Sequence, residues 1–198
     1  MKNTIALFLS LLIGGQILAQ TENKNITTLS MVPQYILNNG IRIDIERQIS
    51  KKSFLQIGPQ FYLAENAMEN PLNRNISYLI GGGCGIFHKI FLLEDFMQTG
   101  VYMSYGLTYN YFGVEFQVHS HDAESMAWGR INKIGADLIF GYQIFEYDRF
   151  IADLYAGLGT RYSFMNPGSV DDFFDDHFWN YNFTGNLLIL GLRLGIIL

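Results

Sequence analysis

The alternation of large apolar and smaller or polar residues is the clearest pattern in this chain. Residues 100–111 read GVYMSYGLTYNY, in which every second place from Val101 to Tyr111 is apolar or aromatic. Successive side chains of a strand point to opposite faces, so this pattern predicts a strand whose two faces meet different surroundings. The second face is built mainly of Gly, Ser, Thr and Asn, without Lys or Glu. It therefore indicates a crowded polar interior and not a solvated surface.

The same alternation predicts eight strands along the chain. We expect them at 27–37, 40–49, 53–63, 76–89, 98–112, 131–145, 149–163 and 186–198. Asn38-Asn39-Gly40 predicts a tight hairpin after the first of them, whereas Pro33 and Pro59 each remove a ladder donor and favour edges or bulges. Short links at 50–52, 90–97 and 146–148 alternate with long polar links at 64–75, 113–130 and 164–185. This order is typical of outer-membrane barrels, whose short turns lie on the periplasmic side.

Charged residues share the face that carries glycine. In IRIDIE, residues 41–46, the three isoleucines lie on one face of the expected strand and the three charges on the other. Four strands together place eight charges on the inward side: Arg42, Asp44, Glu46, Lys133, Asp137, Asp153, Arg161 and Arg193. The signs balance, and an eight-stranded barrel is just wide enough for side chains to fill. We predict a hydrogen-bonded charge network in the lumen, with a narrow ion or proton path as the alternative.

The composition favours a membrane barrel over a soluble β-protein. The chain is 49% hydrophobic, 15% aromatic and 16% charged, with 20 glycines, whereas soluble domains are roughly 25% charged. Beyond the N-terminus, no segment offers the roughly 20 uninterrupted apolar residues of a membrane helix, and closed barrels are the other way to span a bilayer. The predicted fold class is an all-β, eight-stranded antiparallel transmembrane β-barrel in up-and-down order. The net charge of −5 argues against a nucleic-acid partner.

The N-terminus predicts a secretory signal peptide over residues 1–19. Lys2 precedes an apolar run, and Ala19 provides a cleavage residue. We therefore expect residues 20–198 to form a single outer-membrane barrel domain. Cys84 is the one cysteine and lies far from the signal, so the sequence predicts neither a lipidated N-terminal cysteine nor an internal disulfide.

Two motifs carry residue types that are common in enzymes. His119-Ser120-His121-Asp122, with Glu124 nearby, falls on the expected second long link and has the side chains of a hydrolase or a zinc site. However, neighbouring residues of a loop point in different directions, and no further ligand spacing supports zinc. The glycine run at 81–85 lacks the Gly-Lys-Ser/Thr of a phosphate loop and indicates close packing within a strand. We predict no catalytic residue, metal or cofactor.

The third long link combines acidic and aromatic side chains. The group consists of Asp171, Asp172, Phe173, Phe174, Asp175, Asp176, Phe178 and Trp179. The spacing of a calcium loop is absent. An aromatic girdle at the outer membrane interface explains the rings, and exposed aromatic groups are also common in protein interfaces. We expect either a girdle alone or a girdle that also contacts a partner.

Several segments resemble the small eight-stranded outer-membrane β-barrel proteins of Bacteroidota. The similarity is carried by PQYILNNGIRIDIERQI, LQIGPQFYL, GGGCGIFHKIF and the closing GLRLGIIL. It implies a multi-pass barrel in the outer membrane of a Gram-negative bacterium. The group includes accessory subunits of assembly, secretion and uptake complexes, so it implies a non-enzymatic accessory or anchor subunit. The expected partners are outer-membrane lipid and other outer-membrane proteins. A barrel hydrolase acting on lipid or peptide through the His119–Asp122 link, or a narrow channel, remains an alternative.

Overall fold

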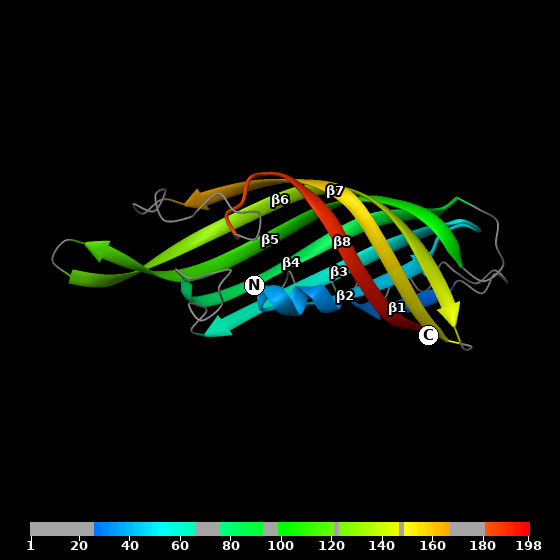
Figure 1. The fold of residues 1–198 in the computed structure, drawn as a ribbon, viewed down its shortest axis with the longest axis horizontal. Helices are drawn as coiled ribbons and strands as arrows, with labels where there is room; N and C mark the ends of the chain where they lie inside the picture. Colours follow the sequence, from blue (N-terminus) through cyan, green and yellow to red (C-terminus); the bar gives the residue numbers. More distant parts are fainter. Residues whose placement is uncertain (1–25, 66–75, 93–98, 121–122, 147–148, 167–180) are drawn as a thin grey trace, which may run out of the picture.

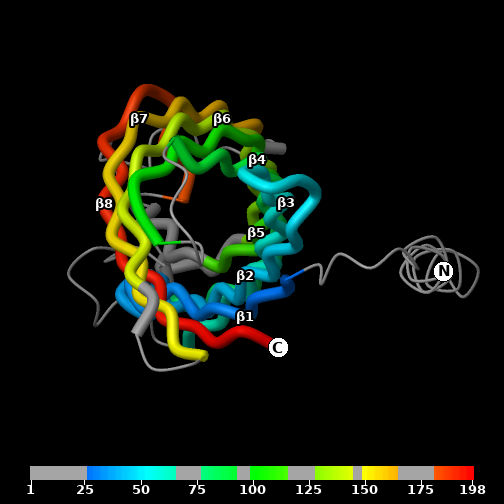
Figure 2. Tube along the Cα trace, turned by 90° about the vertical axis from the view of Figure 1, so that its right-hand side faces the viewer, coloured from blue at the N-terminus to red at the C-terminus, as the bar shows by residue number. Residues whose placement is uncertain are grey.

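The computed structural model describes residues 26–65, 76–92, 99–120, 123–146, 149–166 and 181–198. Within this part, eight strands form a closed barrel in which sequence neighbours pair antiparallel and β8 pairs with β1. The strands are β1 (Thr27–Met31), β2 (Gly40–Gln48), β3 (Ser53–Glu65), β4 (Ile76–Phe91), β5 (Gly100–Ser120), β6 (Ala123–Glu146), β7 (Phe150–Asn166) and β8 (Gly185–Ile197). Figure 1 shows the tilted strands from the side, and Figure 2 shows the ring that they form. The predicted fold class is confirmed.

The two faces of the barrel wall differ sharply in chemistry. On β5, Tyr102 and Ser104 point inward and are fully buried, whereas Leu107 points outward and is 67% exposed. On β8, Leu188 and Leu190 are 64% and 66% exposed. An apolar exterior around a polar interior is the arrangement of a transmembrane barrel and the reverse of a soluble one. Among the described residues, no helix has the length and apolar character to cross a membrane.

The first predicted strand is wrong in its second half. The strand ends at Met31, and a 3₁₀ helix, η1 (Pro33–Asn38), follows instead of a continued strand to residue 37. Pro33 causes the change, because it has no N–H for the ladder and is tolerated in the first turn of a helix. Asn39 adopts a left-handed conformation with φ of 54°. The predicted tight hairpin between the first two strands is therefore wrong: Asn39 ends η1, and Gly40 begins β2.

Pro59 lies within β3, between two neighbouring strands. The ladder between β2 and β3 has no paired residues from the pair Arg42–Gln60 to the pair Ile45–Ile57, and this gap lies opposite Pro59. On its other side Pro59 stays in register with Cys84 of β4. A missing donor thus interrupts one ladder locally without forming a strand edge.

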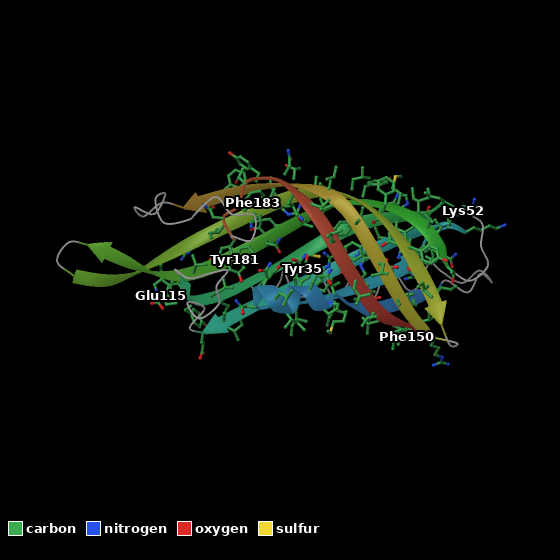
Figure 3. The ribbon with its side chains drawn as sticks, viewed as in Figure 1. Tyr35, Lys52, Glu115, Phe150, Tyr181 and Phe183 are labelled. Carbon is green, nitrogen blue, oxygen red and sulfur yellow. The ribbon has the colours of Figure 1, made fainter. Side chains whose placement is uncertain are left out.

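The predicted long link at 113–130 is also wrong. β5 and β6 continue as a paired hairpin up to Ser120 and Ala123. Apolar residues occupy every second place at 112, 114, 116 and 118. The hydrogen bonds between the two strands join backbone groups, so the polar side chains at the positions in between do not interrupt them. The strands reach 21 and 24 residues, about twice what a bilayer requires. The hairpin extends at one end of the barrel, the Glu115 end, while Lys52 and Phe150 lie at the other (Figure 3).

The glycine run of β4 marks a close approach to β5. A side chain at Gly83 would place its Cβ 2.5 Å from the carbonyl oxygen of Tyr109, inside the distance at which real Cβ atoms are found. At Gly82, which points outward, the nearest heavy atom would be 3.6 Å away. Of these two adjacent glycines, only Gly83 lies where a side chain would collide with neighbouring atoms, and Gly82 has room for one.

We expect Gly83→Ala to destabilise the barrel by about 1–3 kcal/mol, because the added methyl group overpacks the lumen. Gly82→Ala is the matched control and should be close to neutral. Urea unfolding of the protein in lipid vesicles, followed by tryptophan fluorescence and by the heat-dependent shift on gels, measures both. Equal midpoints for the two variants would contradict the close approach.

Candidate functional site

Three cations and three carboxylates occupy the middle of the lumen. This lumen charge network consists of Arg42, Asp44, Glu46, Lys89, Asp153 and Arg193, none more than 5% exposed. The Nζ of Lys89 lies 3.1 Å from Glu46 Oε2 and 3.3 Å from Asp153 Oδ2. These residues come from β4, β2 and β7, which are not neighbours in the ring. Lys89 therefore connects separate parts of the wall across the interior.

Arg193 is the second centre of the network. Its Nη1 lies 2.8 Å from Asp153 Oδ2, and its Nε lies 2.8 Å from Asp44 Oδ2. Arg42 donates from Nε to the other oxygen of Asp44, at 2.6 Å. Because Asp153 is shared by Lys89 and Arg193, and Asp44 by Arg193 and Arg42, all six charges form one connected group. Its formal charge is zero.

Neutral side chains add further hydrogen bonds to the network. Gln56 donates from Nε2 to Asp44 Oδ2 at 2.7 Å, and the hydroxyl of Tyr102 donates to Asp153 Oδ1 at 2.6 Å. Gln143 accepts a bond from Lys89. A buried ion pair is tolerated only when its remaining donors and acceptors are also satisfied. These three residues supply that second set of contacts from β3, β5 and β6.

A second, smaller group of charges lies nearer the hairpin end. Arg161 and Asp137 pair across neighbouring strands, with Arg161 Nη2 donating to Asp137 Oδ2 at 3.1 Å and a closer contact between Nη1 and Oδ1. The Nζ of Lys133 lies 5.8 Å from the centre of the Phe112 ring. The structure thus places all eight predicted residues on the inner face but divides them. It brings together Arg42, Asp44, Glu46, Asp153 and Arg193, and it separates Lys133, Asp137 and Arg161 from them.

Lys89 belongs to the lumen charge network but not to the residues predicted for it. It lies at the end of the predicted fourth strand, where a one-residue error in the boundary removes it from the pattern. The signal was nevertheless present, because Lys89 has the same parity as Gly81, Gly83 and Gly85, which all face inward. Following the period of two to the end of the strand would have identified it.

Aromatic side chains line the lumen on both sides of the network. Toward the hairpin end, the Phe112 ring contacts Tyr62 and Tyr181, with centroids 5.0 and 4.9 Å apart. Tyr181, just before β8, is buried and donates its hydroxyl to the Asn38 carbonyl at 2.8 Å. Toward the opposite end, Phe54 and Phe91 pack with their centroids 5.6 Å apart. The charges are therefore enclosed by rings from two directions.

The other predicted sites fall mostly outside the described residues. His119 and Ser120 belong to β5, where His119 pairs with Glu124 of β6, and only their backbone is described. His121, Asp122 and the acidic and aromatic stretch Asp171–Trp179 lie outside the described residues. In the described part of the chain, no group of three or more His, Cys, Asp or Glu is placed to hold a metal ion.

Comparison with known proteins gives structural likeness only. No protein-family model matches the chain, and no curated protein matches it. The N-terminal β-barrel domain of Pseudomonas aeruginosa OprF is similar with a TM-score of 0.39 and 14% identity, over 88% of this chain and 96% of that one. Acinetobacter baumannii CarO is similar with a TM-score of 0.45 and 10% identity, over 87% and 97%. Identities of this size transfer no function.

We expect Lys89→Met to destabilise the barrel by about 3–5 kcal/mol, because Glu46 and Asp153 would keep their charge in the lumen after losing one of the two cations that they share, with only Arg193 left. Arg149→Met is the control, since Arg149 is exposed at the opposite end from the hairpin. The measurement is the urea midpoint of the folded protein in vesicles. An unchanged midpoint for Lys89→Met would show that the network does not stabilise the fold.

Proposed function

We propose that this chain is a non-enzymatic outer-membrane barrel that acts as an accessory or anchor subunit of a larger assembly, secretion or uptake complex. The observation that carries the proposal is the lumen charge network, which joins separate parts of the wall through the space that a channel would need. A barrel with a filled lumen works through its outer surfaces. The origin of the chain in a Bacteroidota outer membrane is part of the same proposal.

The barrel exterior supports the location. Every strand carries exposed apolar side chains on its outer face, and the ring is closed, so few backbone groups meet lipid unpaired. The short links between β2 and β3, β4 and β5, and β6 and β7 lie at one end, marked in Figure 3 by Lys52 and Phe150. Short turns face the periplasm in bacterial barrels. The hairpin end therefore faces the cell exterior, and the expected signal peptide fits this export route.

The pairing within the lumen supports a plug over a conducting path. Lys89 and Arg193 each contact two carboxylates within 3.3 Å. An ion passing through would have to separate these pairs, and a buried charge that loses its partner costs about 3–5 kcal/mol. Phe112 and Tyr181 pack together in the lumen toward the hairpin end, and Phe54 and Phe91 toward the opposite end. These rings further narrow the path that an ion would follow through the lumen.

The extended hairpin supports contact with a partner outside the membrane. β4 pairs with β5 only as far as Phe116, and β7 pairs with β6 only from Arg130. Beyond these residues, in the described part of the chain, the two strands form a ribbon with a strand partner on neither outer edge. Trp128 is 60% exposed and packs edge-on against Tyr78, as aromatic side chains do at a membrane interface. The ribbon thus begins where the bilayer ends, and free strand edges favour pairing with another protein.

The purified full-length protein should show no steady single-channel current in planar bilayers, because the paired charges fill the lumen. An unrelated open barrel of known conductance is the positive control for insertion. Stable current steps would contradict the plug and favour the channel. Release of fatty acid or peptide from added lipid or peptide, lost in His121→Ala, would instead favour the hydrolase.

Shortening the hairpin should remove the partner. Replacing residues 118–125 by Asn-Gly joins Gln117 to Met126, which already pair across the hairpin, through a favoured two-residue turn. We expect the shortened protein to keep its heat-dependent gel shift and to lose at least tenfold of the proteins that co-purify from native membranes. Lys51→Glu, at the opposite end, is the control. Full recovery of the same proteins by the shortened barrel would contradict the proposal.

A further inference from the structure

On the side that faces β1, β8 has a paired strand beside it over only part of its length. β1 pairs with β8 from Leu194 to Ile197 and stops there. Toward the hairpin end of β8, η1 takes the position that a longer first strand would have occupied. On its other side, β8 remains paired with β7 up to Gly185. The barrel wall therefore contains a seam, by which we mean the gap in strand pairing between η1 and the half of β8 that precedes Leu194.

The hydrogen-bonding direction of β8 shows which residues face this seam. Leu198 donates its N–H to the carbonyl of Thr27 on the β1 side, whereas Ile197 donates to Arg149 on the β7 side. Backbone groups of a strand alternate in direction, so the even-numbered residues of β8 point toward β1 and the seam. Within the described part of the chain, Leu188 and Leu190 have no hydrogen bond on that edge.

One residue of the seam is satisfied by a side-chain amide from η1. The N–H of Leu192 donates to Gln34 Oε1 at 3.4 Å, and Gln34 Nε2 donates to the Tyr155 hydroxyl at 2.6 Å. Gly191 makes room for this contact, because a Cβ there would lie 2.2 Å from Gln34 Nε2. The amide of Gln34 thus takes the place of a neighbouring strand for one residue. Among the described residues, none bonds the backbone of Leu188 and Leu190 on this edge.

A cleft of about 760 Å³ lies beside the open edge. It is lined by Pro33, Gln34, Phe140, Leu154, Leu190 and Leu192, among others. Leu154 and Leu190 are 59% and 66% exposed on the apolar outer face, which places the cleft at the depth of the hydrocarbon. Unpaired backbone groups are costly at this depth, because no water is present to bond them.

We propose that an extended, apolar segment of another outer-membrane protein adds to β8 at this seam as a further strand. An extended peptide presents an N–H and a C=O at every second residue, which is the spacing of Leu188 and Leu190 along β8. The acyl chain of a lipid presents neither group. The inference rests on the proposed accessory role and specifies how the partner is held within the membrane.

A second copy of this chain fits the seam less well. Two copies inserted in the same direction would place their β8 strands side by side and parallel. Antiparallel pairing, the form used throughout this barrel, would not be available to them, and parallel pairing is slightly less stable per residue. A different protein can supply a strand of either direction.

Photo-crosslinking in native membranes tests the seam with the full-length protein. A photoreactive amino acid is placed singly at Leu188, Leu190 or Leu192, and at Leu107 of β5 as the control, which is 67% exposed on another part of the outer face. The three seam positions should label one peptide of one partner protein. Each change of the photoreactive position by two residues along β8 should shift the labelled residue of the partner by two as well. Leu107 should label lipid only.

A backbone variant tests the hydrogen bonding itself. Leu190→Pro removes an N–H that faces the seam and leaves the ladder to β7 intact, so the barrel should keep its heat-dependent gel shift. Labelling of the partner from positions 188 and 192 should fall at least tenfold, while Leu190→Ala should leave it unchanged. If Leu190→Pro fails to fold, the two-residue stepping of the labels decides alone.

Three results would overturn the inference: labelling of lipid alone at all seam positions, labelling of a second copy of this chain, or labelling that a folded Leu190→Pro leaves unchanged. Any of these, together with partners that still co-purify through the hairpin, would overturn the seam and leave the accessory role standing. Absence of any co-purifying protein would instead overturn the accessory role.

Discussion

The pairing of three cations with three carboxylates inside the lumen is the constraint on which the rest of the structure depends. Arg42, Asp44 and Glu46 come from β2, Lys89 from β4, Asp153 from β7 and Arg193 from β8. Arg42 contacts Asp44 within β2, and Arg193 contacts Asp153 across the neighbouring strands β7 and β8. The contacts of Lys89 with Glu46 and Asp153, and of Arg193 with Asp44, join strands that are brought together only when the ring closes. Because an unpaired buried charge is so costly, closing the barrel and neutralising its interior are coupled events.

Under the proposed accessory role, the outer surfaces of this barrel bind the partner, because charged and aromatic side chains occupy its interior. The lumen is occupied by charges, glutamines and rings, which fits a rigid support better than a passage. Two features exceed the needs of a plain membrane anchor. The hairpin of β5 and β6 extends well beyond the length that spans a bilayer, and β8 has no paired strand beside Leu188 and Leu190 on its β1 side within the described residues. These two features, one outside the membrane and one within it, are where a partner would be held.

Pro33 links the local sequence to the weakest part of the wall. By ending β1 after five residues, it removes the neighbour of the upper half of β8, and η1 supplies only the amide of Gln34 in its place. Pro59 has a milder effect, because it interrupts one ladder while β3 stays paired on its other side. The same chemical property, a missing backbone N–H, thus ends a strand at Pro33, whereas at Pro59 it interrupts only one of the two ladders of β3.

The alternation along the chain was enough to predict the fold class and, within the predicted strands that formed, the side of the wall on which a residue lies, because the period of two in a strand follows from backbone geometry. The ends of the strands were predicted wrongly at two places. The polar residues between 113 and 130 favoured a link although the apolar alternation at 112, 114, 116 and 118 continues, and Pro33 ends a strand that was expected to reach residue 37. Nor could the sequence choose partners within the lumen. Asp137 and Arg161 pair locally, whereas Lys89 reaches β2 and β7, since contacts across the interior depend on strand register and ring closure, which only the tertiary structure decides.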